Sequence, residues 1–60
     1  MDKKILEMQY EYNGEWFQIW ETEQTSLGMA WNEVDDQPTE SGCIRFKDSK
    51  EFMIVNGGFR

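Results

Sequence analysis

Carboxylates are the side chains of this chain with the greatest capacity for chemistry. The 60 residues include 12 Asp and Glu, no His and a single cysteine, Cys43. Two carboxylates can act as general acid and general base in glycoside hydrolysis. Such a pair needs a cleft that encloses its substrate, and so short a chain seldom builds one. Without a histidine base or an activating partner for any serine, the sequence predicts no catalytic residue and no enzyme.

The acidic run at residues 35–40 comes nearest to a metal site. Asp35, Asp36 and Glu40 lack the alternating oxygen ligands and the glycine of a calcium-binding loop. Zinc sites need sets of His and Cys that the chain does not contain. We therefore expect no metal and no cofactor, and we expect Cys43 to remain a free thiol in a reducing cytoplasm.

The charge distribution excludes several classes of partner. Every Lys and Arg lies at residues 3–4 or 45–60, and the net charge is −6. Residues 5–44 contain no basic residue but contain Glu7, Glu11, Glu15, Glu21, Glu23, Glu33, Asp35, Asp36 and Glu40. This field repels nucleic acids and anionic membranes and attracts basic proteins. The alternative is that the acids only keep a small β protein soluble. The N-terminus lacks the apolar stretch of a signal peptide, and no apolar run is long enough for a membrane span.

The first half of the chain has the pattern of a β-hairpin. Apolar and polar residues alternate over 4–12, which predicts a strand, and Asn13-Gly14 favours a two-residue type I′ turn. A returning strand at 15–22 would then place Tyr10 opposite Phe17 and Met8 opposite Ile19. This register puts Trp16 and Trp20 on the reverse face, with Glu7 and Glu11. A three-residue loop would exchange the faces and bury both tryptophans.

The second half is less regular. Residues 27–33 fit either a strand or a helix, and Gly28 together with the acids at 35–36 favours the strand. A second hairpin is predicted from strands at 43–47 and 51–56, with Phe46 opposite Phe52. Asn56-Gly57-Gly58 is a further turn signal.

These patterns predict one domain, residues 1–60, of mainly β class. It would be a small twisted antiparallel sheet of about five strands, open or partly closed into a barrel. The alternative is an α+β fold with a short helix near residues 26–36. The expected core is Leu6, Met8, Phe17, Ile19, Leu27, Trp31, Ile44, Phe46, Phe52 and Ile54.

Without catalytic, metal or nucleic-acid motifs, the sequence favours a protein-binding role. Two tryptophans on a charged face would form an apolar patch of the kind that marks interfaces. The expected partner is a basic protein such as a nucleic-acid-binding protein, which this chain would inhibit or regulate by imitating nucleic-acid charge. Small acidic inhibitors from bacteriophages and mobile elements offer an analogy of size and charge, with no shared motif. The alternative is a structural domain that forms a homodimer or packs into an assembly through the Trp16/Trp20 face. The expected partner-binding residues are Glu7, Glu11, Trp16, Trp20, Glu33, Asp35 and Asp36.

Overall fold

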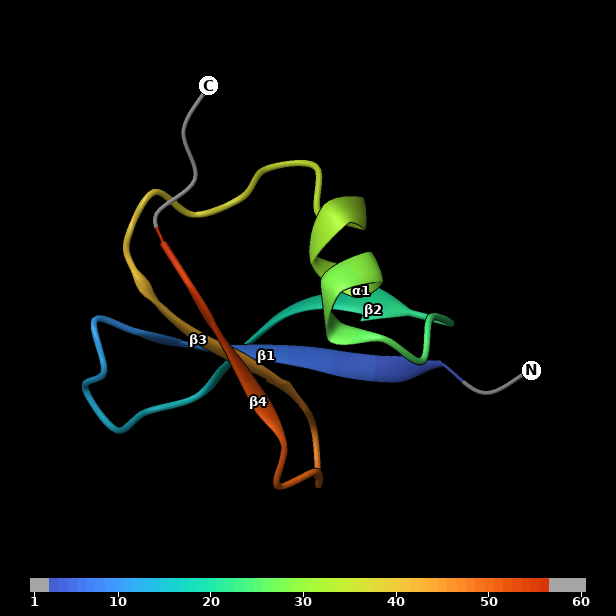
Figure 1. Ribbon diagram of the computed structural model, residues 1–60, viewed down its shortest axis with the longest axis horizontal. Helices are drawn as coiled ribbons and strands as arrows, with labels where there is room; N and C mark the ends of the chain where they lie inside the picture. Colours follow the sequence, from blue (N-terminus) through green and yellow to red (C-terminus); the bar gives the residue numbers. More distant parts are fainter. Residues whose placement is uncertain (1–2, 57–60) are drawn as a thin grey trace.

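The computed structural model describes residues 3–56 of the chain. Its elements are β1 (Lys4–Tyr10), β2 (Phe17–Thr22), α1 (Leu27–Glu33), β3 (Gly42–Phe46) and β4 (Phe52–Val55). The strands form an antiparallel sheet in the order β2-β1-β3-β4, with α1 on one side of it (Figure 1). Because β2 and β4 are separate edges, these strands do not close into a barrel. The mainly β class is confirmed, in the version that includes a short helix. The turn predicted at Asn56-Gly57-Gly58 runs beyond the described residues.

The hydrophobic core fills the space between α1 and one face of the sheet, the inner face. Leu6, Met8 and Ile44 are fully buried there, as the sequence predicted. Leu6 and Met8 belong to β1, one of the two central strands, which pairs with neighbours on both sides. Side chains alternate between the two faces along each strand. The opposite, outer face therefore carries Glu7, Gln9, Cys43, Arg45, Phe52 and Ile54.

The third predicted strand is a helix instead. Ala30 and Val34 lie one turn apart and are both buried, with Leu27 and Trp31 packed against the same cluster. Three side chains of one short helix and the side chain of its C-cap, Val34, thus cover the inner face. The helix contains Gly28 and places Glu33 in its last turn, two features that disfavour helices in isolation. Burial of the apolar stripe outweighs these costs, because tertiary packing supplies most of the stability of short helices.

The register predicted between the first two strands is also wrong. The left-handed turn falls on Glu11 and Tyr12, with φ values of 49° and 58°, rather than on Asn13-Gly14. Met8 consequently lies opposite Phe17, two positions from the expected pairing. A bulge then places the following pair, Leu6 and Trp20, on the inner face. Trp20 therefore packs against the core. It does not share a face with Trp16, although both registers considered from the sequence had placed the two tryptophans on the same face.

The pairing of the last two strands differs from the prediction by one residue. Arg45 lies opposite Phe52, and Ile44 lies opposite Met53. A shift of one residue exchanges the faces of a strand. Met53 and Val55 therefore point to the inner face, while Phe52 and Ile54 are exposed.

The predicted core is corrected accordingly. Phe17, Phe52 and Ile54 were expected inside and are exposed. Half-buried side chains that do pack against the core include Ile19, Leu27, Trp31 and Phe46. Buried apolar residues absent from the prediction are Ala30, Val34, Cys43 and Val55. Apart from Cys43, these come from the helix, its C-cap Val34 and the last position of β4.

Candidate functional site

The seven predicted partner-binding residues, four of which were expected on one face of β1 and β2, lie in separate parts of the fold. Glu7 and Trp16 both contact Arg45 on the outer face, whereas Trp20 and Glu33 are hydrogen-bonded to each other beside α1. Glu11 and Asp36 line a groove at one end of the sheet, and Asp35 is exposed just after the helix. The premise of a single tryptophan-centred face is therefore wrong. Each of the three places has its own chemistry.

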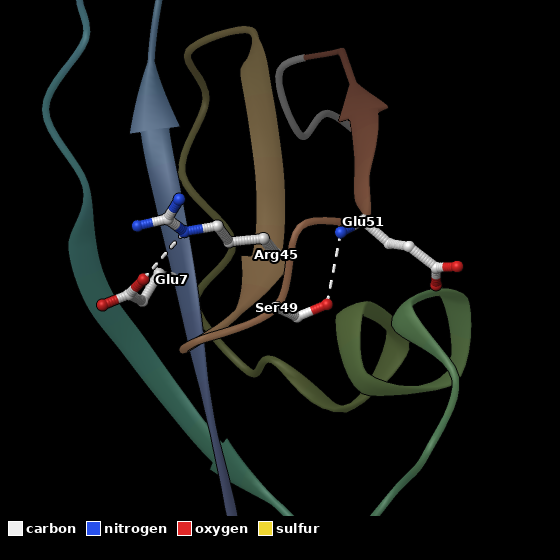
Figure 2. A network of polar contacts seen from close by, with 4 residues as sticks. All are labelled: Glu7, Arg45, Ser49 and Glu51. Atoms are coloured by element: carbon white, nitrogen blue, oxygen red, sulfur yellow. Dashed lines mark hydrogen bonds and ion pairs between the residues drawn. The ribbon is translucent and has the colours of Figure 1, made fainter.

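On the outer face, Glu7 is neutralised by Arg45. The Arg45 Nε donates a hydrogen bond to the Glu7 Oε1 over 3.0 Å, and Figure 2 shows the two side chains meeting from neighbouring strands. The Arg45 guanidinium also lies 4.1 Å from the ring centre of Trp16, a cation–π contact. The sequence did not reveal this arrangement, because Arg45 is 38 residues from Glu7 and only the pairing of β1 with β3 brings them together.

Beside α1, Glu33 joins the helix to β2. Its carboxylate accepts hydrogen bonds from the Thr22 hydroxyl at 2.6 Å, the Gln24 amide at 3.0 Å and the Trp20 indole at 3.2 Å. These bonds, Thr22 first, hold the pKa of Glu33 below its ordinary value of 4.5. Glu33 and Trp20 thus have a structural part in attaching the helix to the sheet.

The groove is the third place, and it gathers acids from two loops. Its carboxylates are Glu11, from the turn between β1 and β2, and Asp36 and Glu40, from the loop between α1 and β3. Tyr10 and Pro38 supply apolar surface, and the remaining lining consists of Asn13, Gln37 and Thr39. We call this site the acidic groove. Its volume of about 760 Å³ is in the range of small-ligand sites, so it can admit a large side chain.

Backbone and side-chain bonds hold the walls of the acidic groove in place. The Glu11 N–H donates to the Ser41 carbonyl over 2.6 Å, which attaches one loop to the other. The Gln37 amide donates to the Trp31 carbonyl over 2.8 Å and fixes the second loop to the helix. Gly42 allows this close approach, because a β-carbon there would collide with the Gln9 carbonyl oxygen. The carboxylates are thus presented by anchored backbone.

The chemistry of the acidic groove is that of a cation site of moderate size. Among the described residues that line it, none is basic. Within residues 3–56, no three Asp, Glu or Cys side chains converge closely enough to hold a metal ion. An ammonium or guanidinium group on an apolar stem matches the groove better, because the stem can contact Tyr10 and Pro38 while the charge meets the carboxylates. The sequence identified Glu11 and Asp36 but missed Tyr10 and Glu40 as their neighbours.

Cys43 is the other reactive group in the described part of the chain. It is buried and unbonded to another cysteine. Burial raises the pKa of its thiol above the ordinary value of 9.0, and the nearby Arg45 charge opposes this only in part. The thiol therefore stays protonated at neutral pH.

Comparisons with protein-family models, curated proteins and solved structures found no match to this chain. Within the part of the chain that the structure describes, no helix has both the length and the apolar character needed to cross a membrane.

Proposed function

We propose that this chain is a non-catalytic module that binds a basic protein, and that the acidic groove holds a Lys or Arg side chain of that partner. The observation that carries the proposal is that Glu11, Asp36 and Glu40 line the same groove, and that none of the other described lining residues is basic. Charge-assisted hydrogen bonds from a guanidinium to such carboxylates are stronger than neutral ones. Anchored walls reduce the ordering cost of binding.

The rest of the charge distribution supports the same partner. On the outer face Glu7 is paired with Arg45, so it adds little to the external field. Other exposed acids lie in the loops on either side of α1, including Glu23 before the helix and Asp35 after it. A negative field on this side would steer a basic surface toward the acidic groove and speed its association.

Nucleic-acid-binding proteins are the proposed class of target, because their binding sites are large basic surfaces that recognise negative charge. Occupation of such a site would exclude the nucleic acid, so the chain would act as an inhibitor or regulator within the cytoplasm. Support for this class comes from charge alone. A competition experiment tests this class of target. Titrating the chain into a complex of labelled DNA with a basic DNA-binding protein should release the DNA, because the chain would occupy the DNA-binding site.

The acidic groove is tested with an arginine-containing peptide and two matched variants. E11Q/E40Q removes two groove carboxylates, and E21Q/E23Q removes two exposed carboxylates elsewhere for the same change in net charge. Surface ion pairs contribute up to about 1 kcal/mol each, so the groove variant should bind about tenfold more weakly. The control should change affinity less than about threefold, through the general field only.

Calorimetric titration at low and at high salt measures these affinities. The native chain should lose affinity as salt rises, because the contacts are between exposed charges. Equal losses in the two variants would show that binding follows net charge and not the acidic groove, and the proposed site would then be wrong.

A further inference from the structure

The outer face of the sheet exposes two large apolar side chains on one edge strand. Phe52 is 60% exposed and Ile54 is 62% exposed, and both project from β4 to the side opposite α1. They are neighbours on that face because they are two residues apart along the strand. Small soluble monomers rarely leave adjacent large apolar side chains uncovered, and such patches mark interfaces.

The surroundings of this patch are almost neutral, unlike the rest of the chain. Arg45 lies opposite Phe52, and Cys43 lies opposite Ile54. Arg45 is paired with Glu7 and stacked on Trp16, so the centre of the outer face carries a compensated charge.

Charges near the edges of the patch do not change this balance. Glu21 also points to the outer face, since it lies opposite Ile5, but it belongs to β2 at the far edge of the sheet. The turn before β4 contains Lys47, Asp48, Lys50 and Glu51, which contribute two charges of each sign.

From these observations we infer that the outer face is where two copies of this chain associate, with Phe52 and Ile54 of β4 at the centre of the contact. The net charge of −6 disfavours self-association through most of the surface. Around Phe52 and Ile54, the carboxylate that the described strands place on the outer face is Glu7, which is already paired with Arg45, so two copies can meet there with little repulsion. A basic partner, by contrast, would gain nothing from this neutral face, so the second copy suits it better.

The small size of the domain also favours self-association. The buried apolar cluster consists of Leu6, Met8, Ala30, Val34, Ile44 and Val55, all on the inner side of the sheet. A core of this size leaves a 60-residue chain marginally stable, and oligomerisation is a common supplement. Covering the outer face would give the sheet a second apolar layer. Because it uses the side of the sheet opposite α1, the contact is independent of the acidic groove.

Salt provides a signature that separates this contact from binding of a basic partner. Two copies of net charge −6 repel at long range, and salt screens that repulsion. Dimer formation should therefore strengthen as salt rises, whereas attachment of a basic peptide to the acidic groove should weaken. The two proposals can fail separately for this reason.

The test is sedimentation equilibrium of the full chain over a range of concentrations, at low and at high salt. We expect a monomer–dimer equilibrium in the micromolar range or above, as for small interfaces, with more dimer at high salt. A chain that stays monomeric at both salt concentrations up to the highest soluble concentration would overturn the inference.

Matched variants locate the contact. I54K places a charge in the patch, while M29K places the same charge on α1, where Met29 is 53% exposed. I54K should weaken the dimer at least about tenfold, as a central contact residue does, although it reduces the net negative charge. M29K should change the dimer less than about threefold. Equal effects of the two, or a dimer that I54K leaves intact, would contradict the assignment.

Circular dichroism checks that each variant remains folded. If I54K unfolds, isotope-filtered NOE spectroscopy of mixed labelled and unlabelled native chains replaces it. Contacts between copies at Phe52 and Ile54 support the outer face, and contacts between copies elsewhere refute it.

Discussion

Replacing Ile44 and Ile54 in turn tests which face of the sheet is covered. The sequence placed both isoleucines in the core, but Ile44 is 0% exposed and Ile54 is 62% exposed. Truncating a fully buried isoleucine to alanine costs about 2–5 kcal/mol, because a cavity adds to the lost transfer energy. At Ile54 only about a third of the side chain is shielded from water, so the expected cost is about 0.5–1 kcal/mol.

Urea denaturation followed by tryptophan fluorescence measures both changes, at low protein concentration so that self-association does not contribute. A chain of this length is expected to unfold with a free energy of about 3–9 kcal/mol, so Ile44→Ala could leave no folded protein. Ile44→Val is the milder variant and should cost about 0.5–1.5 kcal/mol. Equal costs for the two alanine substitutions would refute the pairing of β3 with β4, because they would place both side chains in one core.

Three other predictions concern single positions. Gly42→Ala should lower the free energy of unfolding by about 1–3 kcal/mol, because the new methyl group collides with the Gln9 carbonyl oxygen. Gly28→Ala should raise the free energy of unfolding by about 0.5–1 kcal/mol, because alanine favours a helix more than glycine does and has room in α1. Tyr12→Gly should raise it by up to about 1 kcal/mol, because Tyr12 has a φ of 58° in an exposed turn; a loss in urea denaturation would contradict this. Glu33 has a lowered pKa in the folded state, so its stabilising contribution should be present above pH 4.5 and disappear as the pH falls through the folded value. Glu33→Gln should therefore melt below the native chain at neutral pH, and the difference in Tm should shrink on acidification.

Part of the candidate site could be predicted from the sequence. Glu11 and Asp36 were identified from the excess of acids, and both line the acidic groove. Their meeting could not be predicted, because it depends on the bond between the Glu11 N–H and the Ser41 carbonyl, which joins loops distant in sequence. The neutralisation of Glu7 depends likewise on a cross-strand neighbour, Arg45.

The sequence by itself determined the charge of the chain and four of the five segments predicted as strands. Alternation over residues 4–10 marks β1, and it correctly assigned Leu6 and Met8 to one buried face. A period of two specifies which residues share a face, because successive side chains point to opposite sides of a sheet.

Only the tertiary structure decided which face is covered and how the strands align. In β4 the run Phe52–Val55 is apolar at every position, so the sequence pattern does not show which of its side chains are buried. The pairing of Ile44 with Met53 places Met53 and Val55 on the inner face. In β2 a single bulge turns Trp20 inward while Trp16 stays on the outer face with Arg45. For residues 27–33, local preferences opposed the helix, and the burial of Ala30 and Val34 against the sheet settled its form. In each case the deciding free energy comes from contacts between separate elements of the fold, which local sequence patterns do not contain.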